Sequence, residues 1–274
     1  MRKIAIGIVT YNPNITLISR LELATTSGFF LYIFDNSPEN IIAREFCNRQ
    51  KNTKYITCGK NVGLGFGISS VCAQAYYDSY LALLFFDQDT IFDRSTLDFV
   101  EQFFINNASI ASSYSAIMFN SKNSANVGVA SRFMFKDVLM SINSGSLYFL
   151  ENLNKLNWYN ESYFVDCVDY EFCLKSNNHG FKIGECSNTP GFDHKSEQGD
   201  FEYMIFGKMR QIRKYSLNRV FDYIYASTRL FFTAVKTCNR LFSFAIIRLL
   251  AIYLLFQVIV RLINISITKK EISK

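Results

Sequence analysis

The sequence predicts an α/β fold with a mainly parallel sheet flanked by helices, followed by an amphipathic helical tail. Two observations carry this prediction. Between residues 3 and 90, short apolar runs that end in polar residues alternate with helical stretches, a pattern typical of right-handed βαβ crossovers. In residues 203–274, thirteen Lys and Arg stand against only Asp222 and Glu271. The tail therefore carries +11, and residues 1–202 carry about −5 of the total charge of +6.

Four strands and three connecting helices are predicted in the first part of the chain. The strands are Lys3–Thr10, Leu31–Phe34, Tyr55–Thr57 and Leu81–Phe86. The helices run from Asn14 towards Ser27, up to about Arg49, and through Tyr77. The strand at residues 81–86 contains only apolar residues, which indicates a central strand covered on both faces.

Polar residues follow each of these predicted strands. They are Thr10, Tyr11 and Asn12, then Asp35 and Asn36, then Asn61 and Gly63, and finally Asp87 and Asp89. Because the carboxyl ends of parallel strands meet at one edge of a sheet, we expect these residues to converge on one site. Residues i and i+2 of an extended segment point the same way, so Asp87 and Asp89 suit one hard cation or a phosphate-bearing ligand. The alternative is a simple turn, because Asp is common where strands end.

Three glycines, Gly63, Gly65 and Gly67, follow the third predicted strand. Their spacing differs from the G-x-G-x-x-G fingerprint of dinucleotide sites, and that fingerprint follows a first strand. We therefore expect a turn with close backbone approach here and no NAD site.

The second part of the chain predicts a helix over Ser95–Asn106 with Ser95 as its N-cap. Strands are predicted at Ser115–Phe119, Val127–Phe133 and Val138–Ile142. The small residues of Asn143–Leu147 suit a tight approach to a ligand.

A second acidic cluster lies between residues 164 and 175. In a helix, Asp166, Asp169 and Cys173 share a face, Glu171 lies off it, and the helix ends near Asn177 or Asn178. Acidic residues in a first helical turn are also favoured by the helix dipole alone.

The tail suggests a membrane-facing segment, because its basic residues are mixed with many Phe, Leu, Ile and Tyr, unlike a nucleic-acid-binding patch. On one helix over residues 219–262, six polar side chains fall within a sector of about 100°, with Arg248 as the exception. They are Arg229, Lys236, Arg240, Ser243, Gln257 and Arg261. Arg248 leaves only Leu249–Val260 as an apolar run, short of the roughly 20 residues that span a bilayer. We expect one or more amphipathic helices that attach peripherally to an anionic membrane surface, with an oligomerising helical bundle as the alternative.

Cysteine usage and the N-terminus indicate a cytoplasmic protein. The seven cysteines never form a C-x-x-C pair, which argues against a disulfide framework or a zinc site. A strand-like segment follows Met1-Arg2-Lys3 directly, and no signal peptide is expected. Of the two histidines, His179 lies beside a predicted turn and is expected at the surface, whereas His194 lies in a loop.

Taken together, these motifs resemble family-two inverting glycosyltransferases with the GT-A fold, a Rossmann-like α/β fold. The resemblance covers about residues 3–200 and is closest to the rhamnosyltransferase-like branch of bacterial surface polysaccharide synthesis. The motifs that carry it are Val9-Thr10-Tyr11-Asn12, Asp35-Asn36-Ser37, Asn61-x-Gly63, Phe86-Asp87-Gln88-Asp89, Ser144-Gly145 and Phe164-Val165-Asp166-x-Val168-Asp169-x-Glu171 with Lys175. Their order and spacing make the resemblance specific.

The resemblance implies a role for each matching position. The nucleotide-sugar donor would be bound by Thr10, Tyr11, Asn12, Asp35, Asn36, Asn61, Gly63, Asp87 and Gln88. Asp87 and Asp89, with His194, would hold Mg²⁺ or Mn²⁺ against the donor diphosphate, and a divalent cation stabilises the charge of that leaving group. Asp169 would be the general base that deprotonates the acceptor hydroxyl. Ser144, Gly145, Asp166 and Glu171 would contact the acceptor.

Three positions depart from the family pattern. Ser69 and Lys175 stand where relatives often have Asn and Arg, and Val168 replaces the acidic residue that commonly precedes the base. Lys lacks the bidentate fork of Arg, so a phosphate or carboxylate contact at position 175 would differ. The proposed base itself is retained.

The resemblance thus predicts a metal-dependent inverting glycosyltransferase of cell-surface glycan synthesis, such as O-antigen or capsule. It would have a GT-A domain over residues 1–202 and a membrane-associating region over 203–274, with a lipid-linked or polysaccharide acceptor. Two alternatives remain. In a haloacid-dehalogenase-type phosphatase Asp87 would be the nucleophile and Asp89 the acid, but that fold opens with this motif, whereas three strand–helix units precede it here. A non-catalytic membrane-bound scaffold would have no need of Asp169.

Overall fold

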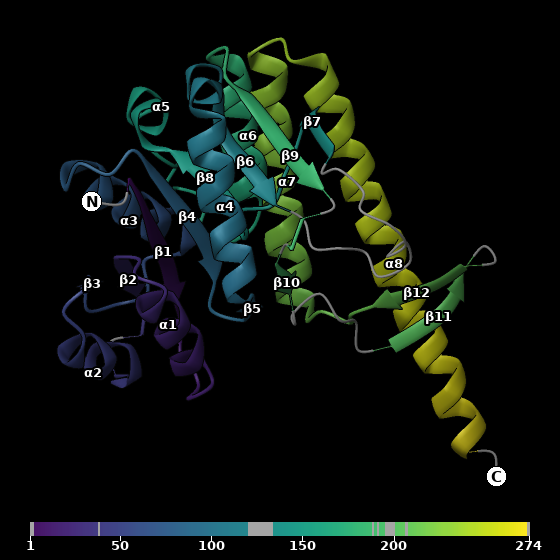
Figure 1. Ribbon diagram of the computed structural model, residues 1–274. Helices are drawn as coiled ribbons and strands as arrows, with labels where there is room; N and C mark the ends of the chain where they lie inside the picture. The colour runs from purple at the N-terminus through teal and green to yellow at the C-terminus, as the bar shows by residue number, and fades with distance from the viewer. Residues whose placement is uncertain are drawn as a thin grey trace. The chain divides into compact units, whose positions relative to one another are not determined.

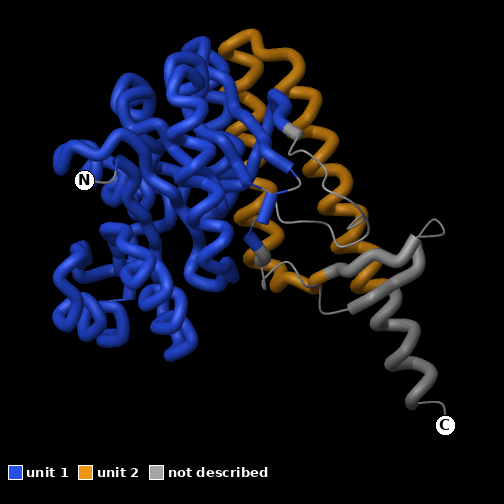
Figure 2. The backbone as a smooth tube through the Cα atoms, in the orientation of Figure 1, with its two compact units in different colours: residues 1–193 blue, residues 194–274 orange. Residues whose placement is uncertain are grey.

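The structure, a computed structural model, describes residues 3–37, 39–119, 134–187, 189–190, 192–194, 201–205 and 208–272. The chain divides into two compact units, residues 1–193 and 194–274 (Figure 2), whereas the sequence predicts a boundary after residue 202. The first unit contains the large sheet, and each unit is described separately below.

The elements of the first unit follow the order shown in Figure 1. The strands are β1 (Ile4–Thr10), β2 (Leu31–Asp35), β3 (Thr53–Thr57), β4 (Ala82–Asp87), β5 (Thr90–Ile91), β6 (Tyr114–Phe119), β7 (Met134–Val138), β8 (Ser146–Phe149) and β9 (Lys182–Ser187). The short strand β10 (Asp193–His194) contains the boundary between the two units. The helices are α1 (Leu17–Thr26), α2 (Ile42–Arg49), α3 (Leu64–Tyr77), α4 (Arg94–Asn106), the 3₁₀ helix η1 (Ala108–Ser112), α5 (Leu150–Lys155) and α6 (Val168–Asn178).

Eight strands form one mixed sheet in the order β3-β2-β1-β4-β8-β6-β9-β7 (Figure 1). The first four are parallel to one another, as predicted. In the second half, β8 is antiparallel to β4 and β6, β9 is parallel to β6, and β7 is antiparallel to β9. The fold is therefore the predicted α/β class.

Alternating side chains of the central strands enter two separate layers of the core. Ile4, Ile6 and Ile8 of β1 belong to a cluster with apolar residues of α1, α2 and α4. The intervening Gly7 faces α3, where an added Cβ would lie 3.0 Å from the Val71 side chain. Because both faces of β1 are covered, its sequence is apolar throughout, as expected for a buried parallel strand.

The register of the parallel strands brings their carboxyl ends to one edge. Thr10 pairs with Asp35, Asp35 pairs with Thr57, and Val9 pairs with Asp87. This edge of the sheet carries the polar residues that the sequence analysis singled out.

Two helix starts differ from the prediction for local reasons. Helix α1 begins at Leu17, because the Asn14 side chain accepts a hydrogen bond from the Thr16 backbone N–H (3.0 Å) and holds a turn there. Helix α4 is capped by Asp93, which accepts from the Thr96 N–H (2.9 Å), so the assignment of Ser95 as N-cap was wrong. Asp93 competes successfully because its carboxylate also accepts from the Ser95 hydroxyl.

The strand predictions of the second half were only partly correct. Strand β6 matches its prediction, and the predicted strand Val127–Phe133 lies outside the described residues. The prediction for Val138–Ile142 was wrong, because β7 ends at Val138. The small-residue stretch instead leads into β8, which the sequence analysis missed.

The second unit contains a hairpin, β11 (Phe201–Ile205) and β12 (Lys208–Ile212), and two helices, α7 (Leu217–Lys236) and α8 (Arg240–Ile272). The predicted helical tail therefore consists of two helices that are separated by a turn at residues 237–239. Cys238 has a left-handed φ of 56° in the turn between α7 and α8, which places the two helices against each other. The Tyr223 and Tyr253 rings are 4.2 Å apart across this contact.

Two polar residues of the predicted basic sector, Gln257 and Arg261, form hydrogen bonds within the second unit. Gln257 is 4% exposed and bonds the backbone of Arg213 and Tyr215. Arg261 donates to the Tyr215 carbonyl (2.7 Å) and to Gln257. These two side chains therefore hold the segment before α7 against α8.

Helix α8 is longer and more apolar than predicted. Its segment Arg240–Leu262 contains an 18-residue window with a mean hydropathy of 2.3, and by length and composition the segment is sufficient to cross a membrane. We expected Arg248 to leave an apolar run too short to span a bilayer, and this was wrong. The many Leu, Ile and Val residues around Arg248 keep the mean hydropathy of the longer segment high. Core helices of soluble proteins have similar length and composition.

Candidate active site

Three carboxylates from two elements form the candidate active site. Asp87 ends β4, Asp89 follows it, and Asp169 lies in the first turn of α6. All three are partly buried. The charges of Asp89 and Asp169 both act on Asp87, so the fold brings together two motifs that are far apart in the sequence. We call these residues the carboxylate cluster.

The protein environment disfavours ionisation in this cluster. Burial raises the pKa of Asp87 to about 7, and the nearby charges of Asp89 and Asp169 raise it further. Burial also raises the pKa of Asp169 to about 6, although backbone N–H groups at the start of α6 oppose the shift. Desolvation therefore outweighs the helix-terminus effect at Asp169. A cation bound beside these carboxylates would favour their ionised form and lower their pKa values.

The start of α6 differs from the sequence prediction. The helix begins at Val168, and Cys167 before it has a left-handed φ of 59°. Asp166 therefore precedes the helix and does not share a helical face with Asp169. The predicted end of the helix near Asn178 is confirmed.

A turn at residues 143–146 fixes the end of β4. The Asp87 N–H donates to the Ser144 hydroxyl (2.9 Å), and Thr90 and Ser144 share a hydrogen bond of 2.7 Å. Gly145 donates to the Phe85 carbonyl with φ of 79°, and a Cβ there would lie 2.8 Å from the Phe192 ring. Ser144 and Gly145 therefore hold the end of β4 that carries Asp87, and their predicted contact with an acceptor stays a prediction.

The two strand-end loops are joined through Gln88. Its side chain accepts from the Tyr11 N–H (2.8 Å) and donates to the Tyr11 carbonyl (3.0 Å). Tyr11 is 52% exposed beside this contact, and Asn12 has a left-handed φ of 45°. The backbone of Tyr11 is thereby fixed while its ring stays accessible.

Arg20 is a site residue that the sequence analysis missed. It reaches from α1 to donate to the Gln88 carbonyl at 2.5 Å, and it lies close enough to Asp89 for their charges to interact. Burial lowers the pKa of Arg20, and the Asp89 charge partly offsets this. Its place in the helix could have indicated partial burial, because Arg20 lies one turn after the buried Leu17 and beside the buried Leu21.

Asp35 is completely buried and is bonded within the protein. Its carboxylate accepts from the hydroxyls of Thr10 (3.1 Å), Ser37 (2.5 Å) and Tyr55 (3.0 Å), and from the Ser37 N–H (2.9 Å). These bonds tie together the ends of three strands. A direct contact between Asp35 and a nucleotide stays a prediction.

Asn36 and the glycine run hold neighbouring loops together. Asn36 accepts from the Val62 N–H (3.0 Å) and donates to the Gly63 carbonyl (3.2 Å), while the exposed Asn61 accepts from the Gly63 N–H. Gly63 has φ of 93°, and an added Cβ would lie 2.7 Å from the Phe164 carbonyl oxygen. The predicted close backbone approach is confirmed, and it brings the segment before Asp166 against the start of α3.

Glu171 and the departing family positions lie inside the protein. Glu171 is 6% exposed and accepts from the Asn160 side chain (3.1 Å). Lys175 donates to the Trp158 carbonyl (2.9 Å), and Ser69 accepts from the Tyr159 N–H (3.2 Å). All three fix the segment of residues 157–160, and a contact of Glu171 with an acceptor stays a prediction.

The metal donors that the structure describes are Asp87 and Asp89. His194 ends β10 and belongs to the second unit, and its side chain lies outside the described part of the chain. Within the described part of the chain, no group of three or more His, Cys, Asp or Glu side chains is arranged to hold a metal. Two carboxylates plus substrate phosphates and water are a common ligand set for Mg²⁺, so the residues present fit such an ion.

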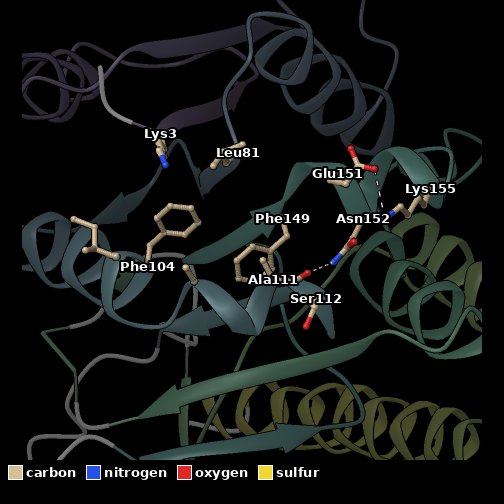
Figure 3. A pocket seen from close by; sticks show the side chains of 11 residues that line it. Lys3, Leu81, Phe104, Ala111, Ser112, Phe149, Glu151, Asn152 and Lys155 are labelled. Carbon is tan, nitrogen blue, oxygen red and sulfur yellow. Dashed lines mark hydrogen bonds and ion pairs between the residues drawn. The ribbon is translucent and has the colours of Figure 1, made fainter.

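The structure also contains a cavity of about 600 Å³ whose lining includes none of the three carboxylates; Figure 3 shows the residues that line it. Lys3 and Leu81 lie on it just before β1 and β4, and Phe104 and Phe149 are among its apolar walls. Since Lys3 and Leu81 mark the amino ends of parallel strands, the cavity is at the edge of the sheet opposite to Asp87.

Comparison with known proteins identifies the fold. No protein-family model and no curated protein sequence matches the chain. Solved structures do match. S. aureus TarS 1–349 in complex with UDP-GlcNAc is 14% identical with a TM-score of 0.51, over 92% of this chain and 71% of that one. S. aureus TarS is 17% identical with a TM-score of 0.50, over 69% and 36%.

GalNAc-T7 with UDP, GalNAc and Mn²⁺ is 10% identical with a TM-score of 0.56, over 82% of this chain and 47% of that one. The chain thus spans less than half the length of TarS and of GalNAc-T7. At these identities the likeness concerns the fold alone. The chain has the GT-A fold, an α/β architecture with a mixed sheet flanked by helices.

Proposed function

We propose that this protein is a metal-dependent inverting glycosyltransferase, which transfers a sugar from a nucleoside-diphosphate donor to an acceptor hydroxyl. The observation that carries the proposal is the convergence of Asp87, Asp89 and Asp169 at one sheet edge of a GT-A fold. The TarS and GalNAc-T7 structures contain UDP-GlcNAc, and UDP, GalNAc and Mn²⁺, respectively, which supports a nucleotide-sugar donor. The comparisons lend no support to the phosphatase or scaffold alternatives.

Asp87 and Asp89 are the proposed metal ligands, and the role of His194 as a further ligand rests on the sequence resemblance. A bound Mg²⁺ or Mn²⁺ would neutralise the charge that develops on the nucleoside diphosphate as the bond to the sugar breaks. Arg20 holds the backbone between the two residues, at the Gln88 carbonyl, and Ser144 holds the backbone N–H of Asp87. The protein thereby supplies a fixed pair of oxygen ligands.

Asp169 is the proposed general base. A carboxylate with a pKa of about 6 is ionised at neutral pH and is more basic than an ordinary Asp, which favours removal of a hydroxyl proton. Attack by the acceptor oxygen on the side opposite to the leaving diphosphate would invert the anomeric centre. Asp166 next to this base, together with Ser144 and Gly145, is proposed to contact the acceptor.

Nucleotide binding is proposed along the ends of β1, β2 and β4. The exposed Tyr11 ring and Asn12 are proposed to contact the base or ribose, and Asp35, Asn36 and Gln88 fix the loops around them. Asn61 and Gly63 extend the same edge. Rhamnose as the transferred sugar, and the rhamnosyltransferase-like branch, rest on the sequence resemblance.

A thermal-shift panel of nucleoside-diphosphate sugars tests this proposal. A donor at about 100 times its Kd stabilises the fold by about 2.7 kcal/mol, which raises Tm by several degrees. We expect one donor to stabilise the wild type when Mn²⁺ is present, with the effect lost in Asp89→Ala. Absence of any donor-dependent shift would count against the proposal.

We further propose that the second unit attaches the protein to the cytoplasmic face of a membrane, near a lipid-linked acceptor. Phe221 and Tyr225 of α7 and Leu241 and Phe244 of α8 are all at least 65% exposed, and the unit is strongly basic. We expect the chain to sediment with anionic but not neutral vesicles, and to be released by high salt. Retention after alkaline carbonate washing would instead indicate that α8 spans the bilayer, and concentration-dependent dimers without vesicle binding would indicate an oligomer.

A further inference from the structure

A buried triangle of polar side chains lies behind the carboxylate cluster. The Asn143 side-chain oxygen is 2.8 Å from the Tyr159 hydroxyl and 3.1 Å from the Tyr148 hydroxyl, and the two hydroxyls are 2.7 Å apart. The three residues are 7%, 3% and 1% exposed, respectively. Buried polar groups cost free energy unless they are hydrogen-bonded, so such a triangle holds its members closely in place.

The protons available limit how the triangle can be arranged. Each of the two hydroxyls has one proton to donate, so at most two of the three oxygen–oxygen contacts are hydrogen bonds at any one time. In a consistent arrangement, one Tyr donates to the other and the second donates to Asn143. Burial raises the pKa of both tyrosines well above their usual value, so both protons are retained. Loss of one hydroxyl therefore removes two of the three contacts.

One side of the triangle contacts the helix of the proposed base. The Tyr159 ring stacks on Phe172 with a centroid distance of 4.4 Å and an interplanar angle of 11°. Phe172 follows Asp169 by one turn of α6. The neighbouring Cys173 also contacts the Ser141 carbonyl through its sulfur (3.7 Å). A shift of Tyr159 would therefore be transmitted to the helix that carries Asp169.

The other side of the triangle contacts the end of β4. Asn143 precedes Ser144, the residue whose hydroxyl accepts from the Asp87 N–H. Tyr148 lies in β8 directly opposite Leu83 of β4. The triangle thus joins the turn that orients Asp87 to the helix that carries Asp169.

We propose that Tyr159 is a positioning residue for the reaction, which sets the placement of Asp169 relative to Asp87 through its hydroxyl bonds to Asn143 and Tyr148 and its stacking on Phe172. This inference deepens the proposed function and rests on it for the catalytic consequence. A general base must lie within hydrogen-bond reach of the acceptor hydroxyl, and small misplacements lower the rate steeply. Donor binding depends on other residues and is not expected to change.

Tyr159→Phe is the test variant, because it removes the hydroxyl and keeps the ring stacked on Phe172. Tyr32→Phe is its matched control. Tyr32 is fully buried and donates one bond of 2.8 Å to Asp78, and it lies near the amino end of β2, away from the cluster. We expect Tyr159→Phe to lower kcat at least about tenfold with less than about a twofold change in donor Kd. Tyr32→Phe is expected to change neither. Equal kcat values for the two variants would overturn the proposal.

Deuterium uptake provides a readout that does not depend on activity. We expect uptake in residues 141–146 and 168–172 to rise together in Tyr159→Phe, and in neither segment in Tyr32→Phe. Unchanged uptake at either segment would overturn the coupling even if kcat fell. If the wild type transfers no sugar but both segments respond, the proposed function fails while the structural coupling stands, so the two failures are distinguishable.

Discussion

Replacing Asp169 with Asn is expected to lower the rate of sugar transfer at least about 10²-fold while making the folded protein more stable. Asn keeps the size and can still accept from the Tyr170 N–H at 2.9 Å, but it cannot take a proton from an acceptor hydroxyl. Loss of a general base lowers kcat by about 10²–10⁴-fold. Steady-state kinetics with a donor identified by thermal shift would measure this, and donor Kd is expected to stay within about twofold.

The pH dependence of the wild type supplies an independent check on Asp169. Its pKa of about 6 means that the base is ionised above pH 6 and protonated below it. With saturating Mn²⁺, which keeps the proposed ligand Asp87 ionised, we therefore expect kcat/KM to be level above about pH 7 and to fall with decreasing pH below 6. The residual activity of Asp169→Asn is expected to lack this acid limb. An acid limb retained in the variant would mean that another group is the base.

The stability effect of the same variant follows from the direction of the pKa shift. The folded protein raises the pKa of Asp169 above its unfolded value of about 4, so the ionised side chain destabilises the fold above pH 6. This cost disappears below about pH 4, where the carboxyl is protonated in both states. Asp169→Asn is expected to gain about 1 kcal/mol at pH 7.5 and little at pH 4. A stability loss at pH 7.5 would show that the backbone bonds to Asp169 outweigh its burial.

Replacing Asp87 with Asn is expected to remove metal-dependent activity almost completely. The variant removes one anionic ligand of the proposed ion from the fixed end of β4. A divalent ion contributes several kcal/mol of charge stabilisation, which corresponds to a rate loss of about 10³-fold. Chelation of the wild type should give a similar loss. Added Mn²⁺ is expected to restore the chelated wild type but not Asp87→Asn.

Asp98→Asn is the matched control for Asp87→Asn. Asp98 is a half-exposed residue of α4 that pairs with Arg94 at 3.8 Å, and surface pairs of this kind contribute little. Its substitution should leave both activity and metal dependence unchanged. Equal activity of Asp87→Asn and Asp98→Asn with Mn²⁺ would remove Asp87 from the metal site.

The first four strands could be predicted nearly to the residue because their local sequence agrees with their environment. Strand β4 is apolar until Asp87, and it is buried on both faces until that residue. The polar residues after β1, β2 and β4 mark the same sheet edge. In this region the buried residues are the apolar ones, so the sequence alone predicts which residues are buried. The convergence of the strand ends follows from parallel pairing.

Strand β8 and the break between α7 and α8 have no comparable local signal. β8 is four residues long and follows a turn of small polar residues, so it resembles part of a loop. Residues 237–239 contain neither Gly nor Pro, yet Cys238 adopts a left-handed conformation that ends α7. Both features depend on tertiary packing, which periodicity does not report.

The parts of the site that were missed are those made by distant residues. Arg20 reaches the Gln88 carbonyl from α1, and its position in the helix pattern shows partial burial but not its partner. The Asn143, Tyr148 and Tyr159 triangle joins a turn, a strand and a loop. Its members are ordinary buried residues until the fold brings them together.

The release of nucleoside diphosphate from a panel of donor sugars, with Mn²⁺ present or chelated, tests the central claim most directly. We expect one donor to be turned over with Mn²⁺, a loss of at least about 10²-fold on chelation, and no recovery in Asp89→Ala. Equal turnover in chelator, or release of inorganic phosphate in place of the nucleoside diphosphate, would contradict metal-dependent sugar transfer by the carboxylate cluster.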